Sequence, residues 1–242
     1  MNRLEKCIRF QLNAMIKSSI IFLAVYFAVT AALFTLFDIY ISTGSGGSLN
    51  SGFYISAGIF VFVYVIVTYK EMFNYLLMFG NTRKNIILST IAASAVMSLM
   101  FSIISTAILQ AERAISHAKG YGWYGGISLL DLAYKDSSVL SESLWLFTFF
   151  FLICSFSLLY STLAYKLGSV FITLFWVCFG LSFLSSPLLM SSKTISEIII
   201  FFFCTEFEHG ILLAPVNFTV MSVIFCLIGY VVSRRQPQTR TT

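Results

Sequence analysis

The chain has 242 residues, of which 58% are hydrophobic and only 10% are charged. A soluble domain of this size carries about a quarter charged residues, so an ordinary soluble enzyme or nucleic-acid-binding domain is excluded. The composition predicts an all-α integral membrane protein with a single transmembrane domain over residues 1–242, in which the net charge of +5 reflects membrane topology and not a nucleic-acid partner.

The first 17 residues carry spaced basic side chains and an apolar stripe at helical spacing, which predicts an amphipathic helix lying in the membrane interface. The apolar run that follows is longer than the hydrophobic region of a cleaved secretory signal. A membrane span needs about 20 apolar residues. The sequence offers six such segments, at residues 18–41, 52–68, 86–109, 144–163, 169–189 and 211–232.

The distribution of lysine and arginine predicts the orientation of these spans. Six spans place both termini on one side of the membrane. With the termini inside, 11 of the 15 basic residues are cytoplasmic: Arg3, Lys6, Arg9, Lys17, Lys70, Arg83, Lys84, Lys166, Arg234, Arg235 and Arg240. The other four lie outside: Arg113, Lys119, Lys135 and Lys193. Because basic residues favour the cytoplasmic side, the sequence predicts that both termini are cytoplasmic.

The segment between the second and third spans, residues 69–85, is too polar for the bilayer and too apolar for a slack linker. As a helix it places five apolar residues on one stripe: Tyr69, Met72, Phe73, Leu76 and Phe79. We expect Lys70 to face elsewhere, Gly80 to end this helix in a left-handed conformation and Thr82 to cap the next one. Arg83 and Lys84 then lie in a first helical turn, where the helix dipole disfavours positive charge, so topology or a partner must favour them.

Two connections on the outer side carry their own predictions. Residues 110–143 are predicted to form the largest extracellular loop, and residues 191–210 a short re-entrant hairpin, because the apolar segment inside it is too short to cross. Glu206, Glu208 and His209 are the one cluster that resembles a ligand set, and a solvated loop is the favoured interpretation. The five cysteines are scattered singly, so no metal site is predicted.

Small polar residues at intervals of four form a ridge on the third span: Ser94, Ser98, Ser102 and Thr106. This ridge has two interpretations, the lining of a substrate path or close packing between helices, and packing is the favoured one.

The spans contain no ionisable residue away from their ends, which argues against a self-sufficient ion-coupled carrier. The sequence also lacks the GxxxxGK[ST] nucleotide loop and the HExxH and GxSxG catalytic motifs. We therefore expect no enzymatic activity and no cofactor in this chain. If it moves a substrate, the energy comes from another chain.

These elements together resemble the membrane subunits of ABC-2-type transporters, compact permeases typical of Gram-positive bacteria. The segment FGNTRK, from Phe79 to Lys84, is similar to an FGxTRK-like segment that such permeases carry where the third span begins. The resemblance implies a permease of the cell membrane that pairs with itself or a sister permease. It implies two separate ATPase subunits that hold ATP and magnesium, and an exported peptide, antibiotic or lipid-linked cargo.

The resemblance also implies that the helix between the second and third spans and the N-terminal helix contact the ATPases. The implied coupling residues are Tyr69, Lys70, Met72, Phe73, Leu76, Phe79, Arg83 and Lys84. Two other functions stay open. A membrane sensor or immunity subunit would bind a ligand through residues 110–143, and a membrane scaffold would transport nothing. Co-purification of an ATPase separates the transporter from both.

Overall fold

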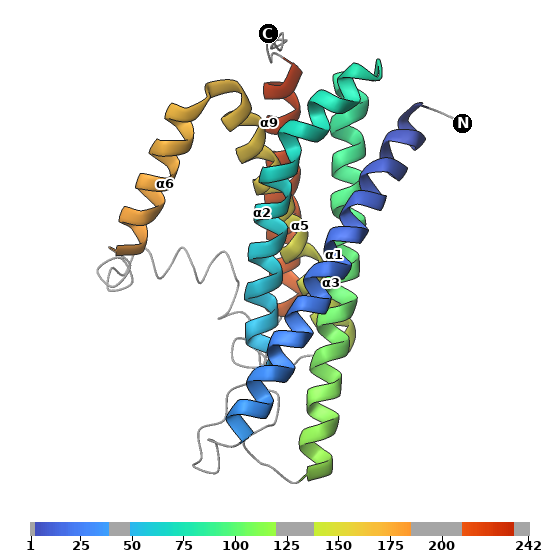
Figure 1. Ribbon diagram of the computed structural model, residues 1–242, viewed down its shortest axis with the longest axis vertical. Helices are drawn as coiled ribbons and strands as arrows, with labels where there is room; N and C mark the ends of the chain where they lie inside the picture. The colour runs from blue at the N-terminus through green and yellow to red at the C-terminus, as the bar shows by residue number, and fades with distance from the viewer. Residues whose placement is uncertain (1–2, 39–48, 120–137, 185–209, 235–242) are drawn as a thin grey trace.

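The computed structural model describes residues 3–38, 49–119, 138–184 and 210–234, and every regular element in these ranges is an α-helix. The helices are α1 (Arg3–Asp38), α2 (Leu49–Met78), α3 (Arg83–Lys119), α5 (Val139–Leu167), α6 (Ser169–Leu184) and α9 (Gly210–Arg234) (Figure 1). Five of these helices are long and apolar enough to cross a membrane. The prediction of a helical membrane protein is therefore confirmed.

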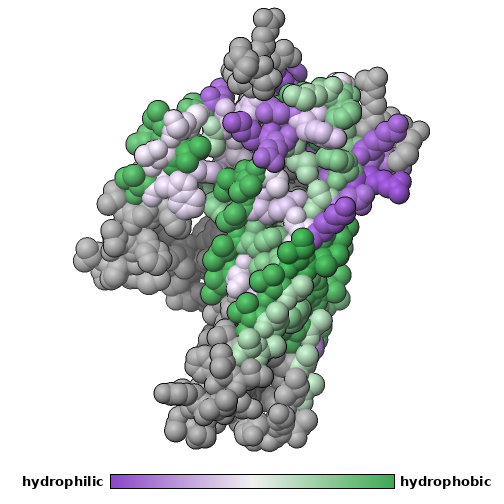
Figure 2. All heavy atoms as spheres, in the orientation of Figure 1, coloured by the Kyte–Doolittle hydropathy of each residue, from purple (hydrophilic) through white to green (hydrophobic). Residues whose placement is uncertain are grey.

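The helices form one elongated bundle from which only α6 departs (Figure 1). α5 packs against α2, α3 and α9, while α1 lies on the outside of α3. The start of α1, the turn between α2 and α3, the turn between α5 and α6, and the end of α9 all lie at the same end of the bundle. We call this the terminal end. Figure 2 shows hydrophilic residues gathered there and hydrophobic residues below.

Aromatic rings fill the middle of the bundle between α1, α2, α3 and α5. Phe101 of α3 is fully buried, and its ring centroid lies 5.9 Å from Phe22, 5.9 Å from Phe60 and 6.0 Å from Phe150. In lipid the surroundings are as apolar as the core, so van der Waals contact and close packing stabilise such a cluster more than burial from water does. Ring contacts therefore join α1, α2, α3 and α5 at the middle of the bundle.

Two predicted boundaries near the terminal end are wrong, because the helices continue through them. Residues 3–17 form no separate helix but are the first part of α1, which is continuous from Arg3 to Asp38. The predicted helix at residues 69–79 is the last part of α2, which ends at Met78. Figure 1 shows this part leaning away from the axis of the preceding turns. Hydropathy marks where a helix leaves the bilayer, whereas capping marks where it ends.

The predicted extracellular loop at residues 110–143 is also too long, because residues 110–119 belong to α3 and residues 139–143 to α5. α3 has 37 residues, about 55 Å, against a hydrocarbon core of about 30 Å. Its sequence after Leu109 (QAERA) consists of good helix formers, so the helix continues although the hydropathy falls.

The remaining outer predictions lie wholly or partly outside the described residues. Residues 120–137 and 191–209, with Glu206, Glu208 and His209, are outside them. α6 covers most of the predicted span 169–189 with 16 residues, about 24 Å.

Candidate functional site

The connection between α2 and α3 is a tight turn fixed by hydrogen bonds. Gly80 has a φ of 71°, in the left-handed region that glycine enters most easily. The next amide, N–H of Asn81, donates to the carbonyl of Leu76 at 3.2 Å, as in a Schellman cap. Thr82 Oγ1 accepts from the Asn85 N–H at 3.3 Å. The predicted stop at Gly80 and cap at Thr82 are confirmed.

The inner face of the last turns of α2 packs inside the chain. Three of the predicted coupling residues, Tyr69, Phe73 and Leu76, are buried. They join α1, α3 and α5 in one apolar cluster: Cys7, Val65, Tyr69, Phe73, Leu76, Ile86, Ile87 and Leu158. These three side chains are therefore not on the surface that a partner protein meets. They fix the end of α2 to the bundle.

Two further contacts hold the same turns from the sides. The ring of Phe10 on α1 stacks on Tyr75, with centroids 5.3 Å apart. The hydroxyl of Tyr165 on α5 donates to Asn74 Oδ1 at 2.9 Å. The end of α2 is therefore tied to α1, α3 and α5.

The outer face of these turns carries exposed apolar side chains. Tyr75, Met78 and Phe79 are 46%, 74% and 66% exposed. The rings of Tyr75 and Phe79 lie 4.7 Å apart, so they form one continuous surface, which we call the tip. The tip follows the charged residues Lys70 and Glu71 along α2. Contiguous exposed apolar surfaces mark contacts with another protein or with the membrane.

The other predicted coupling residues lie around the tip at different depths. Lys70 and Lys84 are exposed, and Met72 is half-buried. Arg83 is half-buried because its Nη1 donates to the carbonyl oxygen of Arg234, the last residue of α9, at 3.2 Å. A helix C-terminus carries partial negative charge, so this contact offsets the unfavourable position of Arg83 at the start of α3. A contact within the chain thus explains why a positive charge is tolerated in the first turn of α3.

The predicted ridge on α3 is buried along its whole length: Ser94, Ser98, Ser102 and Thr106. Ser98 and Thr106 donate to carbonyls of their own helix at 2.8 and 2.9 Å. Ser102 donates to the carbonyl of Ser143 on α5, and Ser98 Oγ lies 3.6 Å from Cys154 Sγ, also on α5. The ridge therefore lies in the contact between α3 and α5, a geometry that supports the packing interpretation.

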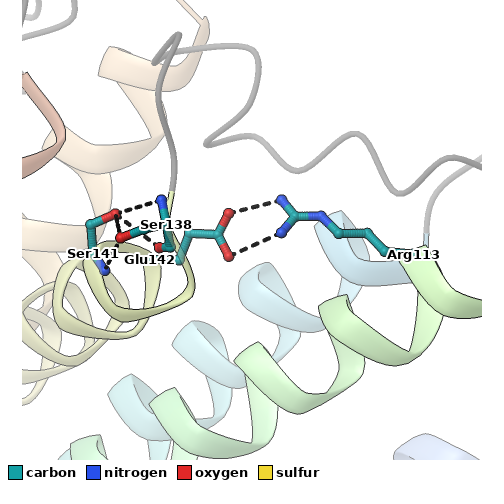
Figure 3. Close-up of polar contacts among 4 residues, drawn as sticks. All are labelled: Arg113, Ser138, Ser141 and Glu142. Carbon is teal, nitrogen blue, oxygen red and sulfur yellow. Dashed lines mark hydrogen bonds and ion pairs between the residues drawn. The ribbon is translucent and has the colours of Figure 1, made fainter.

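An ion pair joins the last turns of α3 to the first turn of α5 (Figure 3), and α3 ends opposite the terminal end (Figure 1). Arg113 Nη2 lies 2.8 Å from Glu142 Oε1, and Nη1 lies 3.3 Å from Oε2. Glu142 is 0% exposed and Arg113 is 26% exposed. Ser138 and Ser141 form a capping box at the start of α5, so Glu142 lies in a first turn, where the helix dipole favours its charge. The pair was not predicted, because both residues lie in the loop that was predicted at residues 110–143.

Titratable residues elsewhere do not form a metal centre in the ranges that the structure describes, since no three His, Cys, Asp or Glu side chains gather there.

The fold and the site together define a multi-pass α-helical membrane protein with an exposed apolar tip at one end and a buried ion pair near the other. No family model, no curated protein and no solved structure matches the chain. The resemblance to ABC-2-type permeases therefore stays a prediction.

Proposed function

We propose that this chain is the permease subunit of an ABC-2-type transporter in the cell membrane, driven by a separate ATPase subunit that binds ATP and magnesium. One observation carries the proposal, namely the exposed apolar tip on a helix end that is fixed to the bundle. A partner can drive a permease only through a contact that transmits motion. The chain has no nucleotide-binding loop of its own, so the energy must enter through such a contact.

Motion applied at the tip has a defined route into the bundle. The turn at Gly80 and Thr82 joins α2 to α3 without slack. The buried cluster around Phe73 joins α2 to α1, α3 and α5. A rigid displacement of the tip therefore moves α2 and α3 together and strains their contacts with α1 and α5. In the proposed transporter this strain opens a path, formed with a second permease, for an exported peptide, antibiotic or lipid-linked compound.

The proposal places the terminal end in the cytoplasm, with six spans in all. Basic residues of the described helices are concentrated at that end, which favours the cytoplasmic side: Lys6, Arg9, Lys17, Lys70, Arg83, Lys84, Lys166 and Arg234. An ATPase in the cytoplasm then meets the tip directly.

Cysteine labelling tests this orientation. In a variant whose five native cysteines are replaced by alanine, Ser138→Cys should react with a membrane-impermeant maleimide added to intact cells. Asn81→Cys, in the turn at the terminal end, should react only after the membrane is permeabilised. Reaction of Asn81→Cys in intact cells would mean that the terminal end faces outward and that the tip cannot meet a cytoplasmic ATPase.

Truncation of the tip tests the proposed docking. Apolar anchors at interfaces commonly cost 2 kcal/mol or more when truncated. The double variant Met78→Ala/Phe79→Ala should therefore lower recovery of an ATPase at least about tenfold, since tenfold is about 1.4 kcal/mol. The measurement is affinity purification from native membranes in mild detergent, with the ATPase quantified by mass spectrometry and by ATP hydrolysis.

Two controls define what this experiment decides. Val223→Ala on α9 removes a similarly exposed apolar side chain elsewhere and should leave recovery unchanged. The chain purified without its partner should hydrolyse no ATP. Full ATPase recovery with the double variant would remove the tip from the interface, and absence of any ATPase with the wild type would refute the transporter itself.

A sensor subunit is the second candidate, and the ion pair between Arg113 and Glu142 favours it. This pair fixes the two helix ends from which residues 120–137 continue, and a fixed base suits a ligand-binding segment. The two functions differ in one outcome. Deleting residues 124–132 should abolish the response to a ligand in a sensor, whereas ATPase recovery through the tip should survive in a transporter.

A further inference from the structure

A groove of about 750 Å³ runs between α1 and α2. It exists because α1 packs mainly against α3 and diverges from α2 toward the terminal end. The stacked rings of Phe22 and Phe60, with centroids 4.4 Å apart, line it, and both rings also contact Phe101 of α3. The groove is open on one side and is not an enclosed cavity, so it suits a molecule that lies against the two helices.

Most side chains that line the groove are apolar, and Ser18, Ser56 and Thr68 are the small polar ones among them. Ile21 and Val25 line it on α1. Ile59, Val63 and Val67 line it on α2, at intervals of four that place them on one side of the helix. All five side chains are exposed. No water in the bilayer competes for such walls, so an acyl chain is the natural occupant.

Toward the terminal end, hydroxyl-bearing side chains join the lining of the groove. Ser18, Tyr64 and Thr68 line that end of it. Lys17 directly precedes Ser18, and Lys70 follows Thr68 by two residues. Both lysines are exposed. Together with the exposed Glu71, which follows Lys70, they are the charged residues that border the two spans, because none occurs between Lys17 and Asp38 on α1 or between Leu49 and Lys70 on α2. Lys17 and Lys70 therefore mark the level of the lipid headgroups.

The length of the groove matches one leaflet. From Thr68 to Ser56 it follows about three turns of α2, or about 18 Å. One leaflet contributes about 15 Å of hydrocarbon, half of the about 30 Å core. An acyl chain that enters beside the lysines therefore finds apolar contact along most of its length.

We propose that this groove binds one anionic phospholipid from the leaflet at the terminal end. One acyl chain lies along Phe22, Phe60 and Val63, and the phosphate lies between Lys17 and Lys70. The two positive charges of the lysines exceed the single negative charge of Glu71, so the site selects an anionic headgroup over a zwitterionic one. The bound lipid fills the gap between α1 and α2 and supports the end of α2 that carries the tip. The proposal requires only that the chain spans the membrane, so it stands apart from ATPase docking.

Lipid retention by the purified full-length chain tests the proposal. The protein is reconstituted in vesicles of phosphatidylglycerol and phosphatidylcholine, extracted into detergent and analysed by native mass spectrometry. The wild type should retain about one phosphatidylglycerol and little phosphatidylcholine. The double variant Lys17→Gln/Lys70→Gln should lower this preference about tenfold or more, because each lysine near an anionic headgroup contributes roughly fivefold. Lys84→Gln/Lys166→Gln removes the same charge away from the groove and should retain the wild-type preference.

A second pair of variants tests the apolar part. Val63→Trp fills the groove and should abolish retention of either lipid, whereas Val223→Trp, on an exposed face of α9, should not. Ile59→Phe serves the same purpose if Val63→Trp fails to fold by circular dichroism. Three outcomes would overturn the proposal: equal retention of both lipids by the wild type, equal effects of the two lysine pairs, or a wild-type dimer that Val63→Trp dissociates. The last outcome would assign the groove to a second copy of the chain.

Discussion

Replacing Arg113 by methionine should lower the free energy of unfolding by about 3–5 kcal/mol, because it leaves the carboxylate of Glu142 buried without its partner. Glu142 is 0% exposed, and Arg113 holds both of its oxygens. For a chain of this size each kcal/mol corresponds to roughly 2–4 °C in Tm, so the apparent Tm in detergent should fall by about 6–20 °C. Thermal unfolding followed by intrinsic fluorescence measures this change.

The two ends of the ion pair should not respond equally. Glu142→Gln leaves the guanidinium of Arg113, which is 26% exposed and reaches water, so the loss should be clearly smaller. The double variant Arg113→Met/Glu142→Leu removes both charges and should recover most of the stability, because a buried pair is often replaceable by apolar side chains. Equal losses for the two single variants would mean that burial of the carboxylate is not the cause.

Phe73→Ala should destabilise the chain by about 3–5 kcal/mol, through the cavity left in the cluster that joins α2 to α1, α3 and α5. Phe73 is fully buried and its ring lies 5.6 Å from Tyr69 and 5.6 Å from Tyr165. The apparent Tm should fall by about 6–20 °C. Any loss of ATPase binding by this variant should follow its loss of folded protein.

Phe79→Ala is the matched control, since it truncates the same type of side chain six residues further along the chain. Phe79 is 66% exposed, so its truncation should change the Tm by no more than about 2 °C. The two variants therefore separate a packing role from a docking role. A large drop in Tm for Phe79→Ala, with none for Phe73→Ala, would invert the assignment of the two faces of α2.

Much of the fold was predictable because the signals for membrane helices are local. Hydropathy over about 20 residues locates a span wherever its neighbours lie. The stop at Gly80 and the cap at Thr82 depend only on the conformational freedom of glycine and the reach of a hydroxyl, so the sequence was enough to predict both. The ends of the helices were less predictable. Residues 110–119 are polar yet helical, and hydropathy cannot distinguish a helix that leaves the bilayer from a loop.

For the candidate site, the sequence predicted an amphipathic helix end but not which of its residues face the rest of the chain. The stripe from Tyr69 to Phe79 is amphipathic, and periodicity alone does not say whether its apolar side meets the same chain or a partner. The packing of α1, α3 and α5 decides this by burying Phe73 and Leu76 and leaving Phe79 exposed. The same holds for Arg83, whose partner is the carbonyl of Arg234, 151 residues away.

The sequence by itself determined that this protein is a multi-pass helical membrane protein, because composition and hydropathy act on each segment independently of the others. Only the tertiary structure decided which of its polar and apolar faces contact other helices and which stay exposed. Contacts between distant segments bury the serine ridge of α3 between two helices, pair Arg113 with Glu142 and open a groove between α1 and α2. Each of these depends on how the helices diverge and pack, and the pattern of residues along one helix carries no information about its distance from the next.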